Sequence, residues 1–359
     1  MRVFMTTDAI GGVWRYSKML AAALATGGTE VRLGVVGEAP ETGAPPGIDA
    51  VHLGVPLDWL AGSADGLAAA RRRIAAAAGS WDADVIQINQ PAFAGDGYPA
   101  PVIAVAHSCV ETWWRGTLGV AAPNDWGWHR DAVRDGLRRA ACAVAPSAAF
   151  AAQLQQAYGL ESPPRAVLNG IGPRTGHGVK QRHLLAAGRG WDESKNFAVL
   201  DRAAADILWP VRMAGSCAGL EGGHVDFAQL ACLGELDAAA MADAFAAAPI
   251  FVSPSLYEPF GLAVVEAAQA GAALLLSDIP TFRELWPDAA LFFDPRDPAA
   301  LACQANRLIL DAGLRTRLAG AARSRAKAFR IETTGREMHR LYCSVACTGW
   351  GEEATVQCA

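Results

Sequence analysis

Short apolar runs alternate with longer alanine-rich or amphipathic stretches along nearly the whole chain, a pattern typical of strands that alternate with helices. Strand-like runs lie at residues 2–5, 30–36, 50–53, 85–89, 102–106, 141–146, 166–168, 183–187, 211–214, 227–232, 249–252, 272–277 and 290–293. Helix-like stretches include residues 14–25, 67–78, 131–140, 148–158, 262–270 and 301–330. The sequence therefore predicts an α/β protein whose parallel sheets are covered by helices on both faces.

The alternation occurs twice, once on each side of a polar, linker-like stretch at residues 174–182. The chain has 359 residues, more than one domain of about 150 residues usually holds. We therefore expect two Rossmann-like domains, residues 1–172 and 173–335, with a cleft between them. Gly335 is expected to act as a hinge, and residues 336–359 to form a last helix and a loose tail.

Composition excludes several classes of protein. Hydrophobic residues make up 52% of the chain and charged residues 19%, and the net charge of −5 gives no sign of a nucleic-acid partner. No apolar run is long enough to span a bilayer, and the first residues do not resemble a signal peptide, so we expect a cytoplasmic protein. The eight cysteines lack C-x-x-C spacing and indicate neither a disulfide framework nor a zinc site.

The stretch from Ser253 to Gly271 has the most specific pattern. A buried strand is followed by a Pro/Ser/Gly loop and then by a helix that begins near Leu262. The free N–H groups at the start of such a helix attract an anion. Glu258 and Glu266 flank this position and could accept hydrogen bonds from hydroxyl groups, which suits a sugar joined to a phosphate. An ordinary helix with solvent-facing glutamates is the alternative.

Other candidate residues follow strands, where ligands of open parallel sheets collect. Gly11 and Gly12 would let the backbone approach a ligand, or form a simple tight turn. His107 could donate to a substrate hydroxyl, or have only a structural role. Arg189 and Lys195 bracket a loop and could neutralise a diphosphate, although many such residues are only surface charges.

Four tryptophans, Trp113, Trp114, Trp126 and Trp128, lie in a segment rich in turn-forming residues. Exposed on a loop, they would form a platform for a carbohydrate acceptor; the alternative is that they fill a gap over the sheet. Basic residues near the end of the 301–330 stretch could contact anionic lipid weakly, at the inner face of a membrane. A solvated face is the simpler interpretation.

Taken together, these motifs resemble the family-four glycosyltransferases, which are retaining enzymes that use nucleotide sugars. Glu258 and Glu266, embedded in Tyr-Glu-Pro-Phe-Gly-Leu-Ala-Val-Val-Glu-Ala, match the family signature closely. The resemblance spans nearly the whole chain, since other family motifs occur in the same order: Gly11-Gly12, His107-Ser108, Ala145-Pro-Ser147, Leu168-Asn-Gly170, and Gly188-Arg189 to Lys195. It departs at Lys195, which lies one residue farther from Arg189 than usual, and at Asn196, where glycine is common.

The resemblance implies the GT-B fold, a last helix that returns to the first domain, and roles for individual residues. Glu266 would hold the ribose hydroxyls, Glu258 the donor sugar, and His107 a hydroxyl of that sugar. Arg189 and Lys195 would bind the diphosphate. The remaining donor contacts would involve Gly11, Gly12, Phe260, Gly261 and Leu262. The tryptophan segment is not part of the signature and is assigned to the acceptor.

The resemblance also implies a reaction: transfer of a hexosyl unit from a nucleotide-diphosphate sugar to a hydroxyl of a glycan, glycolipid or small molecule, with retained configuration. No Asp-x-Asp motif lies in a suitable loop, so we expect no metal and no cofactor, with cationic side chains stabilising the leaving diphosphate. Two alternatives stay open. One is a sugar-nucleotide epimerase on the same fold; the other is an inactive nucleotide-sugar-binding protein.

Overall fold

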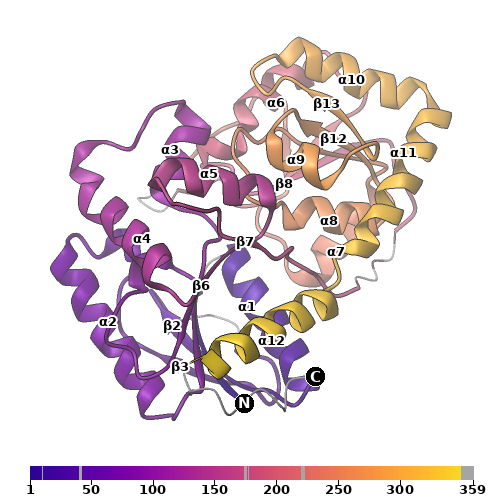
Figure 1. Ribbon diagram of the computed structural model, residues 1–359. Helices are drawn as coiled ribbons and strands as arrows, with labels where there is room; N and C mark the ends of the chain where they lie inside the picture. The colour runs from indigo at the N-terminus through magenta and orange to yellow at the C-terminus, as the bar shows by residue number, and fades with distance from the viewer. Residues whose placement is uncertain (10, 40–42, 174–175, 177, 220–222, 349–359) are drawn as a thin grey trace. The chain divides into compact units, whose positions relative to one another are not determined.

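Figure 1 shows the computed structural model, which describes all residues except 10, 40–42, 174–175, 177, 220–222 and 349–359. The chain divides into two compact units. The first unit comprises Met1–Gly170 and Ile331–Ala359, and the second unit comprises Ile171–Arg330. These limits differ from the expected boundaries at residues 172 and 335. Part of the expected linker, and the expected tail beyond residue 348, lie outside the described residues.

The first unit is built on a seven-stranded parallel sheet of order β3-β2-β1-β4-β5-β6-β7. Its strands are β1 (Arg2–Asp8), β2 (Glu30–Val36), β3 (Asp49–His52), β4 (Val85–Ile88), β5 (Val102–Val105), β6 (Cys142–Ala145) and β7 (Arg165–Ala166). Its helices are α1 (Gly11–Thr26), α2 (Ala64–Gly79), α3 (Val110–Leu118), α4 (Gly127–Arg139), α5 (Ala148–Tyr158) and α12 (Ile331–Thr348), with short turns η1 (Asp58–Leu60), η2 (Pro91–Phe93) and η3 (Asn124–Trp126).

The central strands of this sheet explain its apolar sequence runs. Every residue of β4 and β5 is buried, and so are residues 3–7 of β1, whereas the edge strand β3 is exposed along its length. Parallel strands covered on both faces need such continuous apolar runs. Because β1, β4 and β5 are neighbours and parallel, their carboxyl ends meet at the middle of one edge of the sheet.

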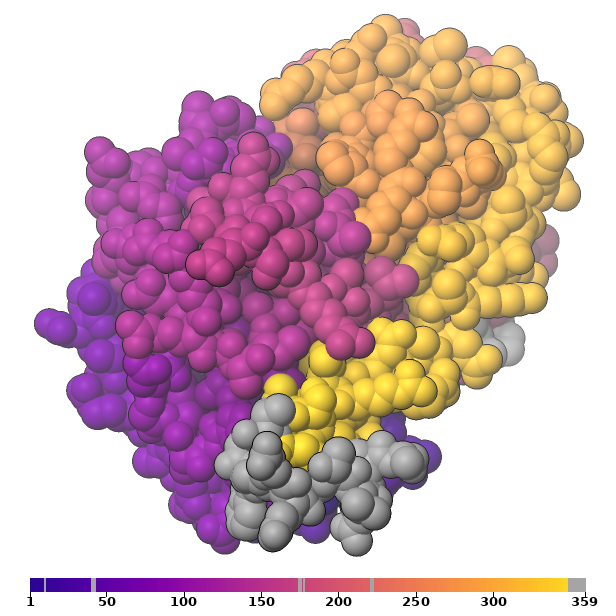
Figure 2. All heavy atoms as spheres, in the orientation of Figure 1, coloured from indigo at the N-terminus to yellow at the C-terminus, as the bar shows by residue number. Residues whose placement is uncertain are grey.

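The last helix contradicts the expected hinge at Gly335. Helix α12 runs unbroken from Ile331 to Thr348, with Gly335 inside it. A Cβ at this glycine would lie 3.3 Å from the Cβ of Ala23 on α1, so the missing side chain allows the two helices to pack closely. The inner face of α12 packs against the rest of the first unit through the buried side chains of Met338, Leu341 and Tyr342. Its outer side, yellow in Figure 2, reaches the surface.

The second unit repeats the architecture with a six-stranded parallel sheet of order β10-β9-β8-β11-β12-β13. Its strands are β8 (Leu184–Ala187), β9 (Val211–Ala214), β10 (Ala231–Cys232), β11 (Ile250–Ser253), β12 (Ala273–Ser277) and β13 (Ala290–Phe293). Its helices are α6 (Phe197–Ala204), α7 (Ala238–Ala247), α8 (Leu262–Gln269), α9 (Pro280–Leu285), α10 (Pro298–Leu310) and α11 (Ala312–Arg325), with short turns η4 (Glu193–Lys195) and η5 (Ala326–Ala328).

Two expected elements of this unit are wrong. Residues 227–232 form a strand only at Ala231–Cys232, because the Asp201 carboxylate accepts the N–H groups of residues 228–230 and holds that segment as a loop. The helix expected over residues 301–330 is broken at Asp311. Its carboxylate accepts from the Leu314 N–H at 2.8 Å and caps α11, which separates that helix from α10.

The predicted α/β class with two parallel sheets is confirmed. Each sheet has its own buried core, formed around β8, β11 and β12 in the second unit and around β1, β2 and β5 in the first. Among the described residues, no helix is both long and apolar enough to cross a bilayer.

Candidate active site

A charged loop follows β8 in the second unit. Arg189 lies at the carboxyl end of this strand, and its guanidinium donates to the Asp192 carboxylate at 2.6 Å while lying over the ring of Trp191. Burial alone would raise the pKa of Asp192, but the charge of Arg189, hydrogen bonds from Ser194 and Arg189, and the charge of Lys195 together lower it. Asp192 therefore stays ionised. The Arg189 side chain is 47% exposed, which leaves it accessible to an anion.

Lys195 and Glu258 come together although they are far apart in the sequence. The Lys195 ammonium donates to Glu258 Oε2 at 2.7 Å, with both side chains largely buried. They meet because β8 and β11 are adjacent parallel strands, so the loops that follow them leave the same edge of the sheet. Ionic attraction between partly buried groups is stronger than at an open surface. The pair therefore fixes the position of each charge.

Asn196 explains how the loop accommodates its departure from the family pattern. It has φ 56° and ψ 36°, the left-handed conformation that glycine adopts easily. Its side-chain amide donates to the carbonyl oxygens of Pro254 at 2.9 Å and Pro295 at 2.7 Å. Asparagine thus supplies the turn and also ties the Lys195 loop to the segments after β11 and β13.

Helix α8 begins beside Glu258. Gly261 precedes it with φ 90°, and a Cβ there would lie 3.1 Å from the Phe282 ring and 3.5 Å from Glu258 Cγ, so the position requires glycine. The first N–H groups of an α-helix have no acceptor within the helix and favour an anion. Phe260, by contrast, packs its buried ring against Phe329, which leaves its backbone as the part that could meet a ligand.

Glu266 lies in the interior of α8 and is only 3% exposed. A buried carboxylate is costly unless it has polar partners. It lies one turn beyond the start of the helix, with its side chain set among buried residues. Glu266 is therefore buried, unlike the solvent-facing alternative, and it has an interaction within the protein; its contact with a ribose stays a prediction.

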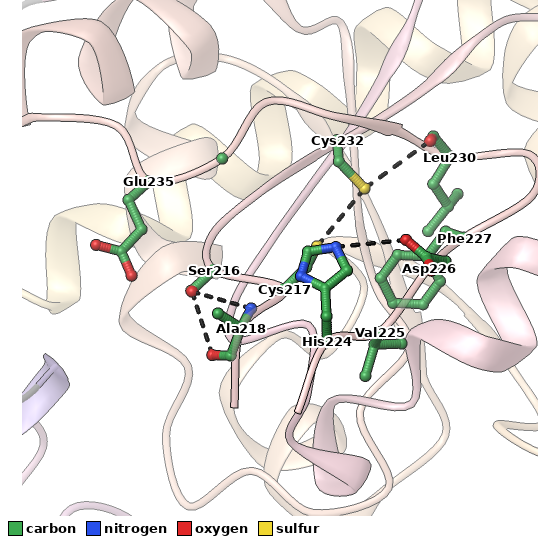
Figure 3. A pocket seen from close by; sticks show the side chains of 11 residues that line it. Ser216, Cys217, Ala218, His224, Val225, Asp226, Phe227, Leu230, Cys232 and Glu235 are labelled. Atoms are coloured by element: carbon green, nitrogen blue, oxygen red, sulfur yellow. Dashed lines mark hydrogen bonds and ion pairs between the residues drawn. The ribbon is translucent and has the colours of Figure 1, made fainter. Parts of the chain in front are cut away.

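A pocket of about 510 Å³ adjoins the Arg189 loop in the second unit. Figure 3 shows its lining, in which the Cys217 and Cys232 thiols approach each other at 3.7 Å and His224 lies beside Asp226. The Gly190 N–H donates to the Ser216 carbonyl at 2.7 Å, so the loop and the pocket wall are directly joined. Sequence reasoning missed this pocket because its lining comes from two irregular segments, after β9 and around β10.

His107 of the first unit follows β5 and is partly buried. Its Nε2 lies 3.2 Å from Oδ1 of Asn89, a residue that follows the adjacent strand β4. The Tyr16 ring packs edge-on against the imidazole, with 4.4 Å between the two ring centroids. Burial lowers the pKa of His107 to about 3, so the ring is neutral at physiological pH. Sequence reasoning found His107 but missed Asn89, which lies within an apolar run and has no recognisable motif.

Gly11 and Gly12 are the first two residues of α1, the helix that follows β1, instead of forming a separate turn. Gly11 has φ 68°, a value that disfavours other residues. Both glycines are exposed, so the backbone at this helix start is open to a ligand.

The tryptophan segment is not the loop that we expected. Trp113 and Trp114 lie inside helix α3, Trp126 ends the short turn η3, and Trp128 lies in the first turn of α4. All four are partly buried, and Trp126 stacks on Trp128 at 6.2 Å. The Glu111 carboxylate accepts from Ala122 N–H and pairs with Arg115, which ties the intervening stretch to α3. The indoles thus have packing roles, and their assignment to an acceptor stays a prediction.

The charged groups of the second unit form a cluster of two ion pairs, Arg189–Asp192 and Lys195–Glu258, and Glu258 lies close before the start of α8. Two cations, Arg189 and Lys195, are held in place by Asp192 and Glu258, which is suited to binding a diphosphate. Among the described residues, no group of three or more His, Cys, Asp or Glu side chains is arranged to hold a metal ion. Sequence reasoning missed Asp192, although an Asp two residues before Ser194 is typical of a capping residue.

Two sequence profiles match the chain. Glycosyltransferase Family 4 matches residues 10–174, and Glycosyl transferases group 1 matches residues 228–325, which include Glu258 and Glu266. The chain belongs to the family-four glycosyltransferases.

Curated glycosyltransferases are similar to the chain at low identity. The O-antigen chain mannosyltransferase B of Escherichia coli is 28% identical over 159 residues, which cover 44% of this chain and 36% of that protein. The chain thus spans about a third of the length of the curated relatives it matches.

Solved glycosyltransferase structures share the fold over almost the full length. Sucrose-phosphate synthase from Thermosynechococcus elongatus has a TM-score of 0.83 at 19% identity, covering 97% of this chain and 100% of that one. Anabaena HepE, solved with UDP-glucose, has a TM-score of 0.72 at 16% identity and covers 96% and 100%. The predicted GT-B fold, with two parallel-sheet α/β units, is confirmed.

Proposed function

We propose that this family-four glycosyltransferase moves a hexosyl unit from a nucleotide-diphosphate sugar to an acceptor hydroxyl, with retention of configuration. The observation that carries the proposal is the Lys195–Glu258 pair beside the start of α8, with Arg189 on the neighbouring strand end. HepE, a structural neighbour, was solved with UDP-glucose, which supports a nucleotide sugar as donor.

The charged side chains Arg189 and Lys195 are suited to stabilising the negative charge that develops during transfer. As the glycosidic bond breaks, the anomeric carbon becomes positive and the diphosphate becomes more negative, so cations interact more strongly with the departing group than with the bound ester. Arg189, Lys195 and the N–H groups after Gly261 would supply this stabilisation. We therefore propose that the reaction needs no divalent metal and no cofactor.

Retention is proposed to follow a front-face route. The departing phosphate would accept the proton of the acceptor hydroxyl, which attacks from the same face that the phosphate leaves. Glu258 is already bound to Lys195 at 2.7 Å, so it is better placed to position the donor sugar than to act as a free nucleophile. In retaining hydrolases, by contrast, two carboxyls flank the scissile bond and one attacks it.

The nucleobase and the ribose of the donor are assigned to the second unit, and two further contacts to the first. The pocket of about 510 Å³ joins the Arg189 loop through Gly190, and its volume falls within the range of ligand sites. We assign the nucleobase to this pocket. Glu266 would bind the ribose hydroxyls. In the first unit, His107 would contact a sugar hydroxyl, and the exposed backbone of Gly11 and Gly12 would approach the phosphate.

The acceptor is proposed to be a glycan or glycolipid. The Escherichia coli relative is named as an O-antigen chain mannosyltransferase, which supports a saccharide acceptor and a hexose donor. Nucleotide sugars are cytoplasmic metabolites, so we place the protein in the cytoplasm, with any membrane contact at the inner face.

Product analysis by ¹H NMR separates this proposal from its alternatives. The protein would be incubated with nucleotide sugars in EDTA, with and without a saccharide acceptor. Release of nucleoside diphosphate together with a product of unchanged anomeric configuration is expected. A changed hexose still attached to the nucleotide would identify an epimerase. A donor that binds and raises the melting temperature without any turnover would identify an inactive binding protein.

A further inference from the structure

A buried polar network lies behind His107 in the first unit. It includes side chains from four elements that are distant in the sequence: Thr6 of β1, Gln87 and Asn89 of β4 and its carboxyl end, Ser17 of α1, and Tyr342 of α12. All five are almost fully buried. Because each buried polar group must find a partner, the hydrogen bonds fix which atom of each amide faces which neighbour.

The orientation of Asn89 is determined by a backbone carbonyl. Its Nδ2 lies 2.7 Å from the Thr6 carbonyl oxygen, which can only accept, and 3.1 Å from Ser17 Oγ. Its Oδ1 therefore faces the other way, toward Gln87 Nε2 at 2.8 Å and His107 Nε2 at 3.2 Å. A carbonyl oxygen can only accept, so both of these nitrogens must donate.

The last helix supports this arrangement. The Tyr342 hydroxyl donates to Gln87 Oε1, which leaves Gln87 Nε2 to donate to Asn89. The register of α12 on the first unit thus helps to define the polarity of a chain of hydrogen bonds that ends at the imidazole.

The consequence for His107 is a single tautomer. Its Nε2 carries the hydrogen, and a neutral ring then has a lone pair on Nδ1. Within the described part of the chain, Asn89 is the one hydrogen-bond partner of this ring, and the ring is partly exposed. Nδ1 is therefore open to a ligand as an acceptor. With this tautomer His107 would accept from a hydroxyl, whereas we expected from the sequence that it would donate.

We propose that Asn89 is a positioning residue that holds His107 as the Nε2–H tautomer, so that Nδ1 accepts a hydrogen bond from a hydroxyl of the donor sugar. The identity of the ligand rests on the proposed function; the tautomer does not. Such a contact selects a donor with a hydroxyl at the matching position, because a hydroxyl can donate to Nδ1 whereas a hydrogen or an ether oxygen cannot.

The groups named here around the His107 ring are all uncharged, so a charge introduced at position 89 would have a large effect on the pKa of the imidazole. Tyr16 of α1 faces the imidazole and Tyr342 of α12 faces Gln87; burial raises the pKa of both phenols, so they stay neutral. Thr6, Gln87 and Asn89 carry no charge. An Asn89→Asp variant would keep the accepting oxygen and add a negative charge next to Nε2–H, which stabilises the imidazolium and raises the pKa of His107. Its second carboxylate oxygen would replace Nδ2 opposite the Thr6 carbonyl oxygen, so the folding of the variant would first be checked by its melting temperature.

Imidazole ¹⁵N NMR of the unmodified protein tests the tautomer without any substrate. The seven histidines would be labelled, and the His107 signals assigned with a His107→Gln variant. We expect a protonated Nε2 and an unprotonated Nδ1 at pH 7. A protonated Nδ1 in the wild type would overturn the proposal.

Kinetics with an accepted donor then test the consequence. Asn89→Ala should mix the tautomers and lower kcat/KM for the donor roughly tenfold, with KM for the acceptor unchanged. In folded Asn89→Asp, the remaining activity should be highest near pH 8.5 and fall as pH falls through the raised pKa of His107, a dependence that the wild type lacks. Gln90→Ala is the matched control, since Gln90 is buried and bonds to Thr6 but not to the ring.

The two halves of the proposal fail differently. Wild-type-like NMR and kinetics in Asn89→Ala would remove the positioning role even if the protein transfers sugar. If no nucleotide sugar is turned over, the proposed function fails together with the sugar contact, and the NMR result alone decides whether Asn89 sets the tautomer.

Discussion

The two units present opposite chemistry at the carboxyl ends of their central strands. In the second unit, ions dominate: Arg189 with Asp192, and Lys195 with Glu258. In the first unit, His107 is neutral and is hydrogen-bonded to Asn89, part of a network of uncharged amides and hydroxyls. Charged groups are suited to a diphosphate, whose charge grows as it leaves, whereas neutral groups of fixed orientation discriminate hydroxyls. The difference suggests a division of labour between leaving-group stabilisation and sugar recognition.

The largest expected effect comes from removing a cation of the second unit. Arg189→Ala should lower kcat by about a hundredfold or more, since each preorganised group that stabilises developing charge contributes on that scale. Donor binding should weaken less than turnover. Steady-state kinetics with the accepted donor would measure both. Arg202→Ala, which removes an exposed arginine from the neighbouring helix α6, should leave kcat unchanged. Equal losses in both variants would contradict a specific role for Arg189.

Glu266 should affect binding more than chemistry. Glu266→Gln keeps the size of the side chain but replaces a charged acceptor, and it should weaken nucleotide binding roughly tenfold with a smaller change in kcat. Isothermal titration calorimetry with the nucleoside diphosphate would measure the dissociation constant. An unchanged dissociation constant in a folded variant would remove the ribose assignment.

The nucleobase pocket can be tested through its exposed thiol. Burial and the neighbouring Cys217 thiol raise the pKa of Cys232 to about 11, so N-ethylmaleimide would be applied at alkaline pH, where more thiolate is present. The adduct on Cys232 would add bulk to the pocket wall, so nucleotide binding should fall several-fold and bound nucleotide should slow the modification. Cys303, exposed on α10, should be modified without loss of nucleotide binding and without protection by nucleotide. Nucleotide binding by a Cys232→Ser variant should therefore resist N-ethylmaleimide, whereas nucleotide binding by a Cys303→Ser variant should be lost as in the wild type. If nucleotide binding by both variants were equally sensitive to N-ethylmaleimide, the assignment of the nucleobase to this pocket would be wrong.

Asn196 should have the smallest effect, mostly on stability. Asn196→Ala loses both side-chain hydrogen bonds and places alanine at φ 56°, which together should cost about 2 kcal/mol of unfolding free energy. Asn196→Gly loses the same hydrogen bonds without the left-handed strain and should be more stable than the alanine variant. Urea unfolding would compare them; the reverse order would contradict the role of the backbone conformation.

Much of the fold was predictable because buried parallel strands read as continuous apolar runs. The strands near residues 30, 102, 211 and 290 were located in this way. The errors have local causes that periodicity does not show. Asp201 holds residues 228–230 as a loop through side-chain hydrogen bonds, Asp311 divides a continuous helical pattern, and Gly335 serves close helix packing rather than a hinge.

Motifs located the candidate site only in part. Glu258 and Glu266 stand out because they belong to one closely matching family motif, and Arg189 because it follows a strand within another. Asp192 and Asn89 were missed because their roles depend on partners, Arg189 and His107, whose proximity only the structure reveals. The tryptophan segment was predicted as a loop for a related reason. Turn-forming residues surround the tryptophans, but the structure has helices α3 and α4 there, and contacts such as the hydrogen bond from Ala122 N–H to Glu111 stabilise the segment between them.

Nucleoside diphosphate release from a panel of nucleotide sugars tests the central claim most directly. The wild type and Arg189→Ala would each be incubated in EDTA with UDP-, GDP- and ADP-hexoses and a saccharide acceptor. The account predicts that the wild type consumes one donor without added metal and that Arg189→Ala, although folded, consumes it far more slowly. Release that requires a divalent cation, or that is equally fast in Arg189→Ala, would contradict the account.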